Sequence, residues 1–150
     1  MSRADRTAGL NAPLTRRPLM EINLPAVRAE LAAVFEAYER ALVDNDIATL
    51  DALFWHSEFT VRYGGGENLY GITAIRAFRA ARPAQGLARE LRNIVITTYG
   101  TDFGTAMTEF WRPSYGAASI GRQSQTWLRT AAPGHGGWRV VAAHVSVIAK

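Results

Sequence analysis

The order of the expected elements constrains this chain more than any other feature of its sequence. Helical patterns dominate the first half, whereas four strands follow one another over 89–99, 103–112, 117–130 and 137–148. Consecutive strands joined by short turns pair antiparallel, because a parallel pair needs a long crossover connection. Helices followed by a run of strands are typical of an α+β protein. We therefore predict helices packed on a mostly antiparallel sheet.

The first helix is predicted from an apolar stripe that follows Pro25 at spacings of three and four residues. Its members are Val27, Leu31, Val34, Phe35, Tyr38, Ala41 and Leu42. Asp46 is the expected cap of a short second helix, and a third helix covers about 71–81. The alternating, β-rich run 59–63 predicts a strand that ends at a triple glycine.

Composition is that of one ordinary globular domain. Of the 150 residues, 48% are hydrophobic and 20% charged, and cysteine is absent, which excludes disulfides and thiol nucleophiles. We expect a disordered basic extension over 1–20 and a single domain over 21–150. No apolar stretch is long enough for a membrane span, and 1–20 lack the apolar segment of a signal peptide. We therefore expect a cytoplasmic protein that does not bind membranes.

The sequence pI near 10 is mostly a property of the N-terminal segment. Residues 1–20 hold four arginines and one aspartate, whereas the other 130 residues hold 13 basic and 12 acidic groups. The expected folded part is nearly neutral and has no Lys/Arg run. Because nucleic-acid modules usually carry a clustered basic face, we expect no nucleic-acid partner.

Strand alternation selects candidate site residues. In 121–129, Gln123, Gln125 and Trp127 share a face, which suits either an apolar ligand pocket with a few amides or a solvated strand face. In 137–148, alternation places His144 and Ser146 on the face of Trp138 and Val140. These two polar groups either find ordinary hydrogen-bond partners in a core or line a cavity.

Two further candidates need partners for their polar ends. Glu109 lies among apolar strand residues, and an arginine such as Arg62 would satisfy it, either as a structural ion pair or in a site. The ring of Tyr38 belongs on the apolar helix stripe, and its hydroxyl is either satisfied in the core or available to a ligand.

Several common chemistries lack their residues. The three histidines lie on separate expected elements, without the spacing of a metal site, and no Gly-x-Ser-x-Gly or Walker motif occurs. We therefore expect no metal and no cofactor. An enzyme of this kind would rely on positioning, electrostatics and a phenol or imidazole as acid or base.

Three segments resemble the AtzH/HpxZ family of the nuclear transport factor 2-like (SnoaL-like) superfamily. They are Glu21–Pro25, Leu53–Gly71 and Ile120–Trp127, and the likeness covers about residues 21–148. The resemblance implies a cone-shaped α+β fold in which N-terminal helices pack on a curved sheet around a deep cavity. It also implies dimerisation through the sheet, which the apolar residues on both faces of the strands favour independently.

The same resemblance implies a function in nitrogen catabolism, either of oxalurate or of cyanuric acid. The implied activity is a metal-free amidohydrolase-type conversion of 1,3-dicarboxyurea to allophanate, with Tyr38 and Arg62 as catalytic residues. Glu109, Gln123, Gln125 and His144 are the candidate substrate-binding residues, and the implied substrate is a small anionic urea or ureide.

Two other classes of function stay open from the sequence. One is a non-catalytic ligand-binding or assembly partner of an amidase-signature enzyme. The other is a ketosteroid-isomerase-like proton shuttle, for which Glu109 is the available carboxylate base.

Overall fold

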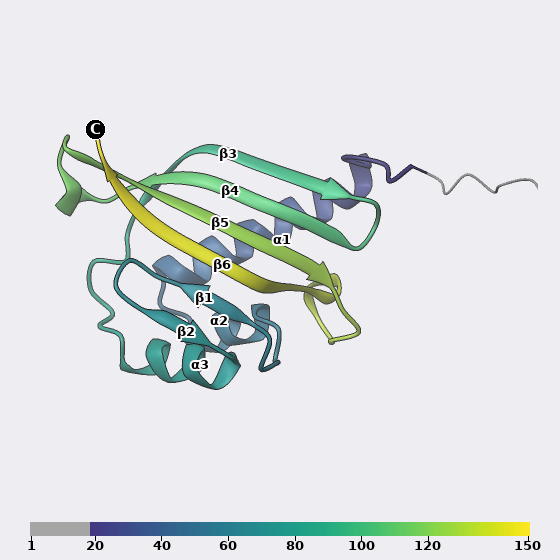
Figure 1. The fold of residues 1–150 in the computed structure, drawn as a ribbon, viewed down its shortest axis with the longest axis horizontal. Coiled ribbons are helices and arrows are strands. Elements are labelled where there is room, and N and C mark those ends of the chain that lie inside the picture. Colours follow the sequence, from purple (N-terminus) through teal and green to yellow (C-terminus); the bar gives the residue numbers. More distant parts are fainter. Residues whose placement is uncertain (1–18) are drawn as a thin grey trace, which may run out of the picture.

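The computed structural model describes residues 19–150, and its elements follow the predicted order with one addition (Figure 1). The helices are α1 (Pro25–Val43), α2 (Ile47–Leu53) and α3 (Ile72–Ala81). The strands are β1 (Val61–Tyr63), β2 (Asn68–Tyr70), β3 (Glu90–Tyr99), β4 (Phe103–Trp111), β5 (Ser119–Arg129) and β6 (Trp138–Ala149). The addition is β2. Residues 1–18 of the extension expected over 1–20 lie outside the described residues.

The six strands form one sheet in the order β2-β1-β6-β5-β4-β3. All neighbours are antiparallel except β1 and β6, which run parallel with Val61 opposite Ala142. The long strands β3 to β6 curve over α1, while α2 and α3 lie near β1 and β2 (Figure 1). This arrangement confirms the predicted α+β fold with helices on a curved, mostly antiparallel sheet.

The core forms where the apolar stripe of α1 meets the inner face of the sheet. All seven residues of the predicted stripe are buried. Trp127 of β5 and Trp138 of β6 are fully buried in the same cluster. Burial of this stripe, rather than helix propensity, holds α1 in place. None of the helices within residues 19–150 has the length and apolar character that crossing a membrane requires.

Local signals fix where the two first helices begin. Pro25 stands in the first turn of α1, where its missing N–H costs no hydrogen bond. The Asp46 carboxylate caps α2 by accepting a hydrogen bond from the Thr49 backbone N–H at 3.1 Å.

Strand β6 contains a bulge that corrects one prediction. Trp127 pairs with Val140 and Thr126 pairs with Ala142, so Val141 is an extra residue. The side chains that follow Val141 therefore point to the opposite faces from those that the alternation before it predicts. The expectation that His144 and Ser146 share a face with Trp138 and Val140 is wrong, because the bulge turns the later pair to the outer face of the sheet.

Candidate functional site

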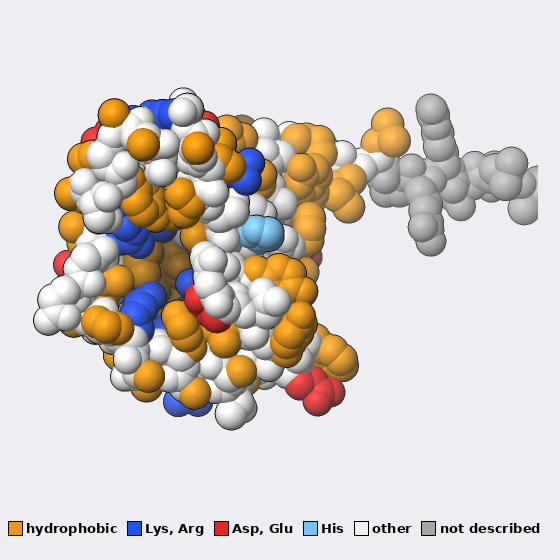
Figure 2. Space-filling model, turned by 60° about the vertical axis from the view of Figure 1, so that its left-hand side comes forward, with side chains coloured by type: hydrophobic (Ala, Val, Ile, Leu, Met, Phe, Trp, Pro, Cys, Tyr) orange, Lys and Arg blue, Asp and Glu red, His pale blue; other side chains and the backbone are white. Residues whose placement is uncertain are grey.

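A cavity of about 200 Å³ lies between the inner face of the sheet and helices α1 and α3. It opens at one end of the molecule, where Figure 2 shows a hollow with Lys or Arg side chains inside it. The polar residues in its wall include Tyr38, Gln123, Arg62, Arg82, Arg89 and Arg112. The wall contains no carboxylate side chain among the described residues, so the cavity is suited to an anion.

Tyr38 reaches this cavity from the middle of α1. Its ring is 5% exposed and lies edge-on to Trp127, with the ring centroids 6.3 Å apart. Within residues 19–150 no group hydrogen-bonds to the hydroxyl, although the ring is part of the core cluster. The sequence left open whether this tyrosine serves the core or a ligand. In the structure its ring packs in the core, and its hydroxyl remains available to a ligand.

Arg62 reaches the same cavity from β1, so it and Tyr38 face one cavity. Its side chain is 14% exposed, and Nη1 donates to Oε1 of Glu67 at 2.7 Å. The guanidinium also lies over the Phe78 ring, 5.3 Å from its centroid. Glu67 therefore holds Arg62 through one nitrogen and leaves Nε and Nη2 for a ligand.

Glu109 is not the partner of Arg62. It lies on the outer face of the sheet, where Asn93 Nδ2 donates to its Oε2 at 2.7 Å. His144 is exposed on the same outer face, above a separate hollow of about 400 Å³. The expectation that Glu109 and His144 join Tyr38 and Arg62 in one substrate site is corrected by this placement, because the sheet separates the two groups.

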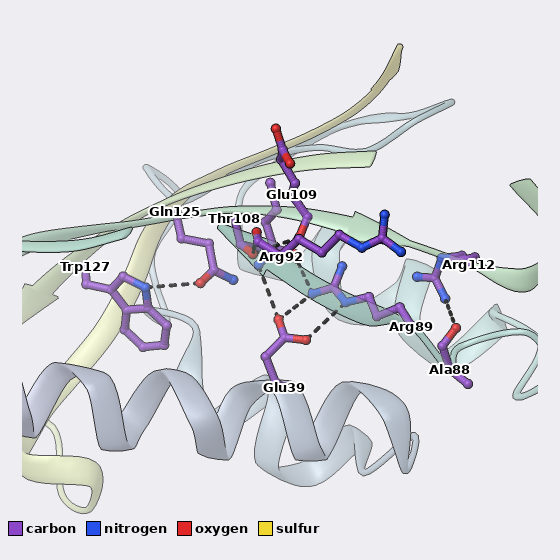
Figure 3. Close-up of polar contacts among 10 residues, drawn as sticks. Glu39, Ala88, Arg89, Arg92, Thr108, Glu109, Arg112, Gln125 and Trp127 are labelled. Atoms are coloured by element: carbon purple, nitrogen blue, oxygen red, sulfur yellow. Dashed lines mark hydrogen bonds and ion pairs between the residues drawn. The ribbon is translucent and has the colours of Figure 1, made fainter. Parts of the chain in front are cut away.

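Gln123 lines the cavity and belongs to a buried polar cluster with Arg89 and Glu39. Figure 3 shows the Glu39–Arg89 pair of this cluster. Arg89 donates from Nε to Oε2 of Glu39 at 3.0 Å, and from Nη2 both to Oε1 of Glu39 and to Oε1 of Gln123. The Arg89 side chain is only 2% exposed and lies over the Phe110 ring. A buried ion pair such as Glu39–Arg89 offsets the cost of removing its charges from water only when it is closely hydrogen-bonded, as it is here.

Gln125 does not reach the cavity wall. It is 1% exposed, and its Oε1 accepts a hydrogen bond from Trp127 Nε1 at 3.1 Å (Figure 3). Its Nε2 has no partner among the described residues. The structure thus places one of the two predicted glutamines beside Tyr38 and Arg62 and puts the other deeper in the core.

Sequence reasoning missed three arginines of the cavity, namely Arg82, Arg89 and Arg112. Arg82 follows α3, and Arg112 follows β4. Both lie at the ends of elements, where periodicity does not tell which way a side chain points. Burial lowers the pKa of the Arg82 guanidinium; Tyr38 opposes this shift, and nearby Arg62 adds to it. An arginine nevertheless stays protonated at neutral pH.

No group of three or more His, Asp or Glu side chains within residues 19–150 is arranged to hold a metal ion. The polar side chains that line the cavity offer guanidinium groups, a phenol and an amide. Guanidinium groups bind carboxylates through paired hydrogen bonds, and a phenol can donate a proton or a hydrogen bond.

Comparison with solved structures defines the class of fold. A nuclear transport factor 2-like superfamily protein from Salmonella enterica is 24% identical, with a TM-score of 0.64 over 83% of this chain and 93% of that one. A cystatin-like fold protein from Burkholderia xenovorans is 48% identical, with a TM-score of 0.80 over 87% and 98%. The chain thus has the nuclear transport factor 2-like fold.

The family of the chain follows from its match to a protein-family model. The AtzH-like family model matches residues 20–150, and the chain belongs to that family. A protein of unknown function from the DUF3225 family of Pectobacterium atrosepticum is 57% identical, with a TM-score of 0.79 over 85% of this chain and 94% of that one. No curated protein matches the chain.

Proposed function

We propose that this protein is a small enzyme that converts carboxylated urea intermediates of the 1,3-dicarboxyurea type to allophanate. One observation carries the proposal: the Tyr38 hydroxyl and the Arg62 guanidinium share a cationic cavity without carboxylates in its described wall. The family resemblance points to these same two residues. The metal-independent character of the proposed reaction rests on the substrate, because a carbamate already loses CO2 readily.

The size of the cavity supports a small ligand. Its volume of about 200 Å³ is below the roughly 300–1,000 Å³ of pockets that take drug-sized molecules. A planar carboxylated urea carries one or two negative charges and several hydrogen-bonding groups in a small volume. Arg62 would hold a carboxylate through its free nitrogens, and the resulting ion pair is favoured because the cavity lies inside the molecule.

The proposed step breaks the bond between a terminal carboxylate carbon and the adjacent urea nitrogen. The electron pair of that bond stays on nitrogen, CO2 leaves, and a proton must reach the nitrogen. The Tyr38 hydroxyl, free of partners among residues 19–150, supplies this proton and recovers one from solvent. The sum is the 1,3-dicarboxyurea dianion plus one proton giving allophanate and CO2.

The experiment is to give fresh 1,3-dicarboxyurea to the purified chain without any amidase. We expect CO2 release and allophanate formation well above the rate without protein. Heat-denatured protein is the control for buffer catalysis. Absence of turnover in this assay would reject the enzyme and leave the alternative, a ligand-binding or assembly partner of an amidase-signature enzyme in the cytoplasm.

We also propose that the chain forms a homodimer through the outer face of the sheet. Helices cover the inner face, whereas Val95 and Met107, which pair across β3 and β4, are 55% and 49% exposed on the outer face. A second copy is the simplest cover for such a surface, since a two-fold interface uses the same patch twice.

A further inference from the structure

The four arginines of the cavity differ in how their charge is balanced. Arg89 is neutralised by Glu39, and its Nε and Nη2 are both occupied. Arg62 is paired with Glu67 through Nη1. Within residues 19–150, Arg82 and Arg112 have no carboxylate within ion-pair distance. The four arginines and two glutamates therefore leave an excess of two positive charges at the cavity.

Arg82 is the less satisfied of the two arginines without a carboxylate. Its Nη2 donates to Asn45 Oδ1 at 3.4 Å, which is a long hydrogen bond. Its Nε is buried and has no partner among the described residues. The half-buried Arg82 has therefore lost hydration at Nε without replacing it, so an anion near this guanidinium would gain more than one beside a fully solvated arginine.

Arg112 makes contacts that leave most of its donors available. Its Nη1 donates to the backbone oxygens of Gly86 at 2.7 Å and of Ala88 at 3.5 Å. The guanidinium lies 5.5 Å from the centroid of the Phe110 ring, on which Arg89 also lies. Nε and Nη2 of Arg112 have no acceptor among residues 19–150.

We propose that Arg82 and Arg112 form a second anion-binding subsite, and that the cavity selects ligands with two carboxylates. Arg62 comes from β1, whereas Arg82 follows α3 and Arg112 follows β4, and all three line the one cavity. This inference rests on the proposed function, and it adds the residues that would hold the second carboxylate of the dianionic substrate. Arg62 holds one carboxylate beside Tyr38, and the second subsite holds the other end.

The test uses stable probes rather than a reactive substrate. Glutarate has two carboxylates at the ends of a five-atom chain, as 1,3-dicarboxyurea does, and butyrate is glutarate without one carboxylate. Titration calorimetry should show that the wild-type protein binds glutarate about tenfold or more tightly than butyrate, as expected for an added charge-assisted contact.

Arg82→Gln should remove this preference by weakening glutarate about tenfold while leaving butyrate within about twofold. The binding free energy lost with the arginine and that lost with the second carboxylate should not be additive, because both changes remove the same contact. Arg76→Gln is the matched control. Arg76 lies on α3 and is 57% exposed, so this substitution removes the same charge at a position away from the cavity. Arg112→Gln should act like Arg82→Gln. Because Arg112 also holds the loop at Gly86, thermal unfolding checks that variant.

The outcomes separate this inference from the proposed function. Equal wild-type affinity for glutarate and butyrate, or equal losses of both probes in Arg82→Gln, would overturn the second subsite. Turnover of 1,3-dicarboxyurea together with that result would leave the proposed function standing. A preference for glutarate without any turnover would support the subsite and reject the enzyme.

Discussion

Replacing Glu39 by glutamine should destabilise this protein far more than the same change one turn earlier on α1. Glu39 is 12% exposed in its side chain, and its partner Arg89 is 2% exposed. Glu39→Gln removes the negative charge from a buried pair and leaves the Arg89 guanidinium without its counter-charge. Breaking a buried pair from one side costs about 3–5 kcal/mol.

The amide oxygen of glutamine can still accept one hydrogen bond from Arg89, so we expect the lower end of this range. A loss of about 3 kcal/mol corresponds to a fall in Tm of roughly 6–12 °C for a domain of this size. Urea unfolding followed by circular dichroism gives the free energy of unfolding, and calorimetry gives Tm.

The matched control is Glu36→Gln. Glu36 lies on the same helix, is 73% exposed and stands 4.0 Å from Arg40, which is also exposed. Its loss should change the free energy of unfolding by less than about 0.5 kcal/mol. The double variant Glu39→Leu/Arg89→Met removes both buried charges and should be more stable than Glu39→Gln. Equal effects of Glu39→Gln and Glu36→Gln would refute the account of the buried cluster.

Three further predictions concern the assembly and the stability of the fold. Light scattering should show a dimer at micromolar concentration, and Met107→Glu should shift it toward the monomer; a stable wild-type monomer would reject the proposed interface. Gly121→Ala should cost about 1–3 kcal/mol in urea unfolding, because the added methyl carbon would lie 2.2 Å from the buried Phe110 ring, whereas Gly66→Ala, with nothing within 4 Å, should cost little. Hydrogen bonds from the Thr49 hydroxyl and then from its backbone N–H lower the pKa of the Asp46 carboxyl, which caps α2. The stabilising effect of this cap is therefore present above the unfolded-state pKa and is lost as the pH falls through the lower folded-state pKa. The stability difference between wild type and Asp46→Ala should shrink correspondingly in acid, and a difference independent of pH would contradict the assignment.

Much of the fold was predictable because its patterns are uninterrupted. The stripe of α1 runs over five turns without a break, and all its apolar members are buried. The alternation over 59–63 is also regular, and in the structure Arg62 lies on the inner face, opposite the exposed Phe59 and Tyr63. Two regular patterns were thus enough to bring Tyr38 and Arg62 to one cavity. Strand β2 was missed because it is only three residues long, Asn68–Tyr70, and lies between the glycines and α3.

The errors arise where a single residue changes the geometry. The bulge at Val141 reverses the facing of His144, and no glycine or proline in the surrounding sequence marks it. Arg82, Arg89 and Arg112 were missed for another reason. They lie just outside elements: Arg82 follows α3, Arg89 precedes β3 and Arg112 follows β4, where periodicity does not tell which way a side chain points. Of the predicted substrate-binding residues, only Gln123 lines the described part of this cavity, together with arginines that no local pattern indicates.

The most direct test of the central claim is turnover of 1,3-dicarboxyurea by Tyr38→Phe and Arg62→Lys. Tyr38→Phe removes one hydroxyl and little volume, so stability should change by only about 1 kcal/mol. Arg62→Lys keeps the charge but loses the planar pair of donors that binds a carboxylate. The account predicts that both variants stay folded and lose most of the wild-type turnover. Folded variants that work at the wild-type rate would show that Tyr38 and Arg62 do not carry the reaction.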